Sequence, residues 1–133
     1  MDKNVLDIVC KKAHHCNMEP VLNTAVSGLR AAAKRLEVSA SNVVNERSTG
    51  YVPRRVQQTA YADGGTRADT VPVQPASVPF FDPNDPEAAA TRPNVSVEQE
   101  IVEQMLARRA YEANLRTVET ADRMTRTLLD TVA

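Results

Sequence analysis

The chain contains 133 residues, with 16 lysines and arginines against 17 aspartates and glutamates, so it carries a net charge of −1 and fits a single small domain. The near-zero charge argues against a general nucleic-acid-binding protein, which would carry a clear excess of basic residues. No run approaches the roughly 20 apolar residues of a membrane span, which excludes direct membrane insertion. Because apolar residues make up only 42% of the chain, we expect a thin core that completes its burial against partner molecules.

The first 17 residues contain one short apolar cluster and one cluster of metal-binding residue types. The apolar cluster, Val5 to Cys10, is interrupted by Asp7, so a secretory signal peptide is not predicted. Four potential zinc ligands fall close together, at Cys10, His14, His15 and Cys16. Their spacing matches no common zinc site, so we predict no metal and no cofactor. A metal-dependent binding module built on these four side chains is kept as an alternative.

A helix is predicted between Val21 and Thr49, a stretch that contains no proline and one glycine. Apolar or small residues recur there at alternating spacings of three and four, which is a heptad seam formed by Leu22, Ala25, Leu29, Ala32, Leu36, Ser39 and Val43. Leucine and alanine alternate along the seam, so a facing helix can approach closely at the alanines. Val26, Ala33 and Ala40 widen the stripe, which allows more than one neighbour to pack against it. The helix is expected to stop near Ser41 to Asn45, because asparagine tolerates the left-handed conformation that ends helices.

The middle of the chain is predicted to be non-helical, since seven of the eight prolines fall between Tyr51 and Pro93. Two segments in it read as extended, Tyr51 to Tyr61 and Arg67 to Val73. The sequence Asp63-Gly64-Gly65 between them is a turn signal of the kind that closes hairpins, so we predict a small β-hairpin. From Pro75 to Pro93 the composition predicts a mostly irregular connection, with Phe80-Phe81 as its only anchor.

A second helix is predicted over residues 94–133, because this segment contains neither proline nor glycine. Ser96 and Gln99 form a capping-box pattern, and Glu98 and Glu100 lie in the first turn. An apolar stripe follows at Ile101, Met105, Tyr111, Leu115, Val118, Ala121 and Leu128. The stripe drifts more than a strict heptad, so its face rotates along the helix and meets several partners in turn.

Arg108 and Arg109 beside Tyr111 raise the alternative of a basic patch that binds nucleic acid. The preferred interpretation is a solvated helix face with the intrahelical pairs Arg108–Glu112 and Glu112–Arg116.

The two ends of the chain carry two separate motifs. The first runs from Leu22 to Leu36 and continues with Ser41-Asn42-Val43-Val44-Asn45 and Thr49-Gly50-Tyr51. The second is Asn94-Val95-Ser96-Val97, followed by Glu100, Met105, Arg109, Tyr111, Glu112, Ala113 and Asn114. Together they resemble the N- and C-terminal motifs of the flagellar basal-body rod protein family. The resemblance covers residues 20–61 and 93–131, and the short insert is similar to that of the proximal-rod subunits.

The resemblance implies a mainly α fold in which the N- and C-terminal helices pair as an antiparallel coiled coil, with a small β-hairpin and a proline-rich loop inserted between them. It also implies a structural subunit without enzymatic activity, which assembles into an axial tube that transmits torque and serves as an export channel. We divide the chain accordingly into an N-terminal extension (1–17), an N-terminal rod helix (18–49), a hairpin and loop insert (50–93) and a C-terminal rod helix (94–133).

The implied location is the periplasmic rod of the flagellar basal body, after export from the cytoplasm. The implied partners are further copies of the chain, other rod subunits, proteins at the junction between the MS ring and the rod, and the flagellar type III export apparatus. The implied assembly interface consists of Leu22, Ala25, Gly28, Leu29, Ala32, Leu36, Asn42, Asn45, Ile101, Met105, Tyr111, Asn114, Leu115 and Val118. Because Gly28 and the alanines allow close helix contact, Gly28→Val or Ala32→Leu is expected to block assembly by overpacking.

One departure from the family concerns the start of the chain. Met18 stands where chains of the family usually begin, so we interpret residues 1–17 as an extension, disordered or upstream of the true start. A competing functional hypothesis is a cytosolic helical-hairpin regulator or chaperone, which would form a stable soluble dimer and would not leave the cell.

Overall fold

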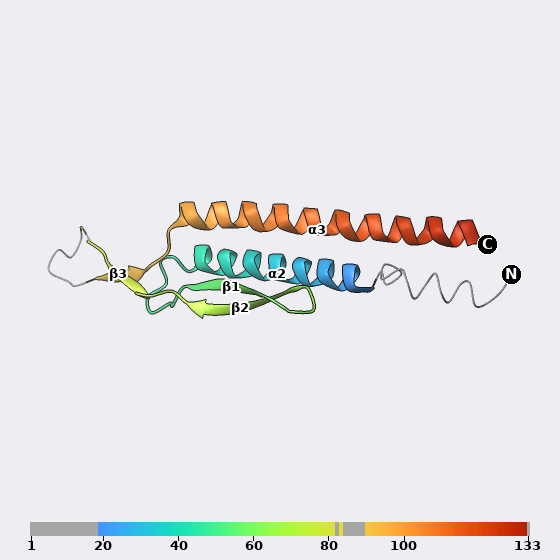
Figure 1. The fold of residues 1–133 in the computed structure, drawn as a ribbon. Coiled ribbons are helices and arrows are strands. Elements are labelled where there is room, and N and C mark those ends of the chain that lie inside the picture. Colours follow the sequence, from blue (N-terminus) through green and yellow to red (C-terminus); the bar gives the residue numbers. More distant parts are fainter. Residues whose placement is uncertain (1–18, 82, 84–89, 133) are drawn as a thin grey trace.

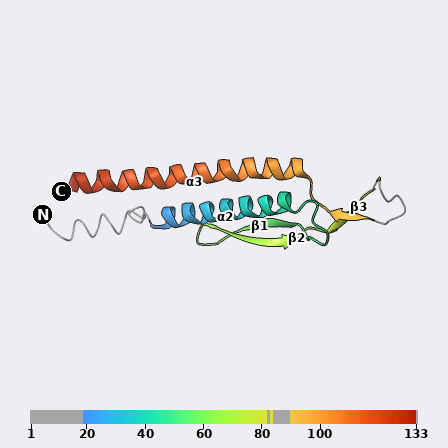
Figure 2. The same ribbon diagram turned by 180° about the vertical axis from the view of Figure 1, so that it is seen from behind.

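Two long helices lie side by side and run in opposite directions in the computed structural model of the protein, which describes residues 19–81, 83 and 90–132 (Figure 1). Helix α2 spans Glu19–Val44 and helix α3 spans Val97–Val132. The chain between them forms two small antiparallel sheets. The view from behind in Figure 2 shows the same order of layers, with α2 between α3 and the first of these sheets. The predicted arrangement of two helices with a β insert between them is therefore confirmed. The Cys10 to Cys16 cluster lies outside the described residues.

Helix α2 ends inside the predicted segment, but the predicted left-handed asparagine is wrong, because among the described residues only glycines have positive φ. After α2 ends, the Ser41 carbonyl accepts two hydrogen bonds from Asn45, one from Nδ2 at 2.9 Å and one from the backbone amide at 3.1 Å. At the start of α3, the Ser96 hydroxyl accepts a hydrogen bond from the Gln99 amide at 3.4 Å. A full capping box would turn the Gln99 side chain back to the Ser96 amide. That side chain instead accepts a hydrogen bond from Arg55 at 3.1 Å, so it links α3 to the insert.

The predicted hairpin is confirmed, with strands β1 (Arg54–Ala60) and β2 (Thr66–Pro72) paired in register from Arg54 with Pro72 to Ala60 with Thr66. The turn uses Gly64 at φ +91° and Gly65 at φ +95°, a backbone conformation that favours glycine. The tip of the hairpin is tied to α2, because the Thr66 amide donates to the Ser27 hydroxyl at 3.0 Å. The hairpin is therefore fixed along one side of α2.

The segment from Pro75 to Pro93 is more regular than predicted. Strands β3 (Ser77–Pro79) and β4 (Thr91–Pro93) pair antiparallel, flanked by amide-to-carbonyl hydrogen bonds from Phe80 to Ala90 and from Asn94 to Ala76, each 2.9 Å long. In this register Pro79 and Pro93, the last residues of the two strands, occupy positions where the ladder needs no N–H donor. The high proline content of the segment is therefore compatible with strand pairing. The predicted anchoring role is wrong for Phe81, which is 69% exposed, whereas the Phe80 ring lies 5.5 Å from the Arg92 guanidinium of β4.

The core consists almost entirely of small side chains. The buried hydrophobic residues are Ala25, Ala31, Ala32, Val38, Ala107 and Ala121, while many large apolar side chains on both helices are exposed. Among the described residues, no helix is long and apolar enough to cross a membrane. The thin core expected from composition is thus confined to the contacts of α2 with α3 and with the hairpin.

Candidate assembly surface

Helices α2 and α3 meet along two lines of small residues. On α2 the line consists of Ala25, Ala32 and Ser39, which are 3%, 2% and 1% exposed. On α3 it consists of Ala107 and Ala121, which are each 1% exposed, with Asn114 midway between them and partly buried. Neighbours within each line are seven residues apart, the spacing that keeps one face of a helix toward a partner. Small side chains on both helices let the two backbones approach closely.

Gly28 lies at a close approach of α2 to α3. A Cβ atom at Gly28 would lie 2.7 Å from Oδ1 and 2.8 Å from Nδ2 of Asn114. The Asn114 amide is itself held by a hydrogen bond from Nδ2 to the Ala110 carbonyl at 2.8 Å. Gly28 and Asn114 therefore fit together because Gly28 has no side chain and the Asn114 amide occupies the space where one would lie. Both residues thus have a role in packing within the chain.

Asn42 joins three parts of the fold at the opposite end of the helix pair. Its Nδ2 donates to the Arg54 carbonyl at 2.8 Å and to Oε1 of Glu100 at 2.9 Å. Its Oδ1 accepts from the Arg54 amide at 3.1 Å and from the Tyr51 hydroxyl at 3.0 Å. The side chain is 1% exposed, so these four bonds satisfy an amide that water does not reach. Asn42 therefore holds the end of α2, the start of β1 and the start of α3 in one arrangement.

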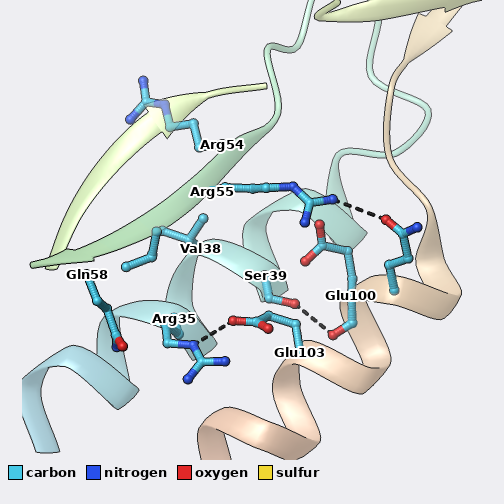
Figure 3. Close-up of a pocket in the computed structure, with 10 residues that line it drawn as sticks. Arg35, Val38, Ser39, Arg54, Arg55, Gln58, Glu100 and Glu103 are labelled. Carbon is cyan, nitrogen blue, oxygen red and sulfur yellow. Dashed lines mark hydrogen bonds and ion pairs between the residues drawn. The ribbon is translucent and has the colours of Figure 1, made fainter. Parts of the chain in front are cut away.

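Two further polar contacts cross between the helices beside Asn42, and Figure 3 shows both. The Ser39 hydroxyl donates to the Glu100 carbonyl at 3.0 Å, and Arg35 Nε donates to Glu103 Oε1 at 2.6 Å. The hydrogen bond from Arg35, helped by its charge, holds the pKa of Glu103 below its ordinary value despite partial burial, and the same bond raises the pKa of Arg35. These groups line a polar cleft of about 390 Å³ between the hairpin and the helices.

The large apolar residues of the predicted seam and stripe do not fill the contact between α2 and α3. Leu22 and Leu29 are partly exposed, and Leu36, Ile101, Met105, Tyr111 and Leu115 are 40–53% exposed. The seam is therefore divided: its alanines and Ser39 lie in the contact between the helices, whereas its leucines keep much of their surface exposed. These exposed and partly exposed side chains, together with the neighbouring Val26, Ala33 and Ala40, form what we call the open face. It consists of Leu22, Val26, Leu29, Ala33, Leu36 and Ala40 on α2 and Ile101, Met105, Tyr111 and Leu115 on α3.

The open face and the hairpin occupy opposite sides of α2. Buried Ala31 and exposed Ala33 are two residues apart, which at 3.6 residues per turn places them on opposite sides of the helix. Along the open face, Leu36, Ile101, Met105 and Tyr111 line an apolar groove of about 410 Å³ between the two helices. An uncovered apolar surface of this kind is typical of a site that packs against another molecule.

The structure thus divides the predicted interface residues into two groups. Six lie in contacts or helix ends within the chain: Ala25, Gly28, Ala32, Asn42, Asn45 and Asn114. Seven lie on the open face: Leu22, Leu29, Leu36, Ile101, Met105, Tyr111 and Leu115. Val118 is partly buried at the border between the groups.

Sequence reasoning missed the role of Glu100, which is 7% exposed and receives the Asn42 amide. The favourable interaction of an acidic side chain with the helix dipole is enough to explain a glutamate in the first turn of a helix. The one further sign that Glu100 faces α2 is its spacing of seven residues from Ala107.

The predicted ion pair between Arg108 and Glu112 is confirmed at 2.9 Å, whereas the ion pairs among the described residues do not include Glu112 with Arg116. The described residues contain no group of three His, Cys, Asp or Glu side chains that could hold a metal ion.

Comparison with known proteins gives matches at both ends of the chain. A family model described as "Flagella basal body rod protein" matches residues 22–51, and one described as "Flagellar basal body rod FlgEFG protein C-terminal" matches residues 89–131. The chain is also 34% identical over 120 residues to proteins named flagellar basal-body rod protein FlgC from Salmonella typhimurium strain LT2, Salmonella typhi and Escherichia coli O157:H7. In each case the match covers 78% of this chain and 90% of the relative.

Proposed function

Because this chain belongs to the flagellar basal-body rod protein family, we propose that the paired helices α2 and α3 are the part that assembles with other subunits. The chain is a FlgC-like structural subunit of the rod of the flagellar basal body. Its proposed work is mechanical: the subunits form an axial tube that transmits torque and surrounds an export channel. The observation that carries the proposal is the open face, which leaves the larger apolar side chains of both helices uncovered.

We further propose that α2 and α3 pair as an antiparallel coiled coil in the rod. The heptad spacing of Ala25, Ala32 and Ser39 supports this, as does the matching spacing of Ala107 and Ala121 about Asn114. The polar contacts of Asn42 and Arg35 at one end make the pair stiffer than apolar packing alone would. A stiff helix pair suits a subunit that passes torque to its neighbours.

The proposed division of labour follows the chain order. The segments 18–49 and 94–133 supply the assembling helices, and residues 50–93 supply the insert that covers the other side of α2, with residues 1–17 as an extension outside this plan. The proposed partners are further copies of the chain and other rod subunits, then the proteins at the junction of the MS ring and rod, and the type III export apparatus during assembly. The family membership supports the rod subunits as partners most directly.

The experiment that tests the open face replaces Met105, which is 53% exposed, by aspartate in the source bacterium. A carboxylate placed in an apolar contact between subunits should lower the recovery of the chain in purified hook-basal bodies about tenfold or more, with a matching loss of motility. Because Met105 is exposed in the free subunit, the cellular level of the chain should stay unchanged.

A matched control uses Val71, an exposed apolar residue on β2 that lies outside the open face. The Val71→Asp variant should assemble and swim like the wild type, because Val71 is an exposed residue of the insert and not part of the open face. Normal recovery of Met105→Asp in basal bodies would show that the open face is not an assembly surface.

A further inference from the structure

The polar cleft follows one edge of the hairpin, with Arg54, Val56 and Gln58 of β1 in its wall. In an antiparallel pair, the backbone groups of alternate residues point toward the partner strand and away from it. The Val73 amide donates to the Pro53 carbonyl at 2.8 Å, so the odd-numbered residues of β1 point toward β2. The even-numbered residues therefore turn their N–H and C=O groups away from β2, on the side of the cleft.

Asn42 already occupies the first of these outward positions. Its side-chain amide donates to the Arg54 carbonyl at 2.8 Å and accepts from the Arg54 amide at 3.1 Å, which are the two bonds that a residue of a neighbouring strand would make. The next two positions, Val56 and Gln58, differ from the first. Among the residues that the structure describes, no side chain and no loop bonds their outward groups. The edge of β1 is thus paired at its start and open beyond it.

The charge that is left uncompensated in the cleft is positive. Its two glutamates are already engaged, one by Arg35 and one by Asn42. Arg55 reaches across the cleft and donates to the neutral side chain of Gln99 at 3.1 Å (Figure 3). Within the described part of the chain, the ion pairs include neither Arg55 nor its neighbour Arg54. An acidic group that entered the cleft would therefore meet two arginines without an acidic partner.

We infer that the cleft receives an extended, acidic segment of a partner protein, which adds to the edge of β1 as a third strand. The outward N–H and C=O groups of Val56 and Gln58 bond the backbone of this segment and continue the pairing that Asn42 begins. Side chains on a strand alternate between its two faces. Acidic side chains of the segment lie beside Arg55, and apolar ones alternate with them beside Val56, which is the one half-buried residue of β1.

The row of open backbone groups is what selects a peptide strand as the occupant. A small anion could bind the arginines, but it would leave the N–H and C=O groups of Val56 and Gln58 without partners. A third strand also strengthens the sheet, because a two-stranded hairpin is only marginally stable.

The outer edge of β2 is less suited to the same segment. It ends at Pro72, which has no N–H to donate, and its Arg67 is neutralised by Asp69 at 2.8 Å. The difference in charge and in backbone donors between the two edges assigns the segment to β1.

The test measures amide hydrogen exchange by nuclear magnetic resonance on the purified full chain, so it does not depend on rod assembly. The probe is a capped seven-residue peptide in which glutamate and valine alternate, added at millimolar concentration. In its presence the amides of Val56 and Gln58 should exchange about fivefold more slowly, because the added strand accepts their hydrogen bonds. The outward amides of Ala68 and Thr70, on the opposite edge of the hairpin, serve as the matched internal control and should not change.

Two altered peptides and one variant separate the contributions to binding. A peptide with lysine in place of glutamate should give no protection, and neither should the acidic peptide with methylated backbone nitrogens, which cannot donate to the edge. Because Arg55 is exposed, Arg55→Glu should leave the fold intact. This variant should lose the protection by the acidic peptide and gain protection by the lysine peptide.

Several results would overturn the assignment. Protection of Ala68 and Thr70 in place of Val56 and Gln58 would move the added strand to the other edge. Equal protection by the acidic and lysine peptides would exclude an acidic segment, and equal protection by the methylated peptide would exclude strand addition. Protection that rises with protein concentration in the absence of peptide would make a second copy the occupant. Unchanged exchange of Val56 and Gln58 with every peptide would refute the site.

Discussion

The junction at Asn42 predicts a large loss of stability for Asn42→Asp, a change of nearly constant shape. The carboxylate cannot donate, so the Arg54 carbonyl and Glu100 each lose a hydrogen bond now 2.8 Å and 2.9 Å long. Two buried acceptors left unsatisfied cost about 1–3 kcal/mol each, and the new carboxylate also repels Glu100. We expect the free energy of unfolding to fall by about 3–5 kcal/mol, a large part of the total for a small domain.

The measurement is urea denaturation of the full chain, followed by far-ultraviolet circular dichroism. Asn45→Asp serves as the matched control, because Asn45 lies at the exposed end of the same helix, where its side chain donates to one carbonyl and accepts from the Ser48 hydroxyl. Since only the donated bond is lost, this change should cost about 0.5–1.5 kcal/mol. Adding Glu100→Gln to Asn42→Asp should restore much of the loss, since the glutamine amide can donate to the new carboxylate. Equal losses in Asn42→Asp and Asn45→Asp, or no recovery in the double variant, would refute the proposed role of the junction.

Three further predictions concern the contacts of α2. Gly28→Val should lower the midpoint of thermal unfolding, because its side chain would displace Asn114, and adding Asn114→Ala should recover part of the loss; equal midpoints for Gly28→Val and the wild type would contradict this packing. Because the pKa of Glu103 is lowered in the folded chain, its pairing with Arg35 stabilises the fold above the pKa of the unfolded carboxyl, about 4.3, and this stabilisation is lost as the pH falls through the lower folded value. The difference in stability between wild type and Glu103→Gln should therefore shrink between about pH 5 and pH 2, and a constant difference would refute the pairing. Ser27→Ala removes the hydroxyl that accepts a hydrogen bond from the Thr66 amide at the hairpin tip. Hydrogen exchange of the Thr66 amide should therefore accelerate about fivefold to tenfold, with the amides of α3 as the internal control.

Much of the fold could be predicted because its signals are local. The proline distribution and the Asp63-Gly64-Gly65 turn indicated a hairpin, and Ser96 indicated the start of α3 one residue before its observed first residue, Val97. The pairing of β3 with β4 escaped prediction because it depends on which backbone groups of two proline-containing strands face each other, and composition does not specify that register.

The candidate surface was predictable as a set of residues but not as an arrangement. Heptad spacing alone does not say which of several neighbours a position faces. When a leucine stripe lies beside an alanine stripe on one helix, the spacing is equally compatible with either stripe facing the partner helix. The structure places Ala32 in the helix contact and leaves Leu36 on the open face, because the hairpin occupies the other side of α2. The same limit explains Glu100, whose burial depends on Asn42 from a distant part of the chain.

The sequence by itself determined the helices, the hairpin, the thin core and the resemblance to rod proteins, because each depends on residue type, on spacing within one segment, or on a motif. Only the tertiary structure decided which side of each helix is covered. That choice depends on contacts between segments 58–86 residues apart, such as Asn42 with Glu100 and Gly28 with Asn114. A spacing pattern records that a residue is suited to a contact, but the contact itself is selected by the whole fold.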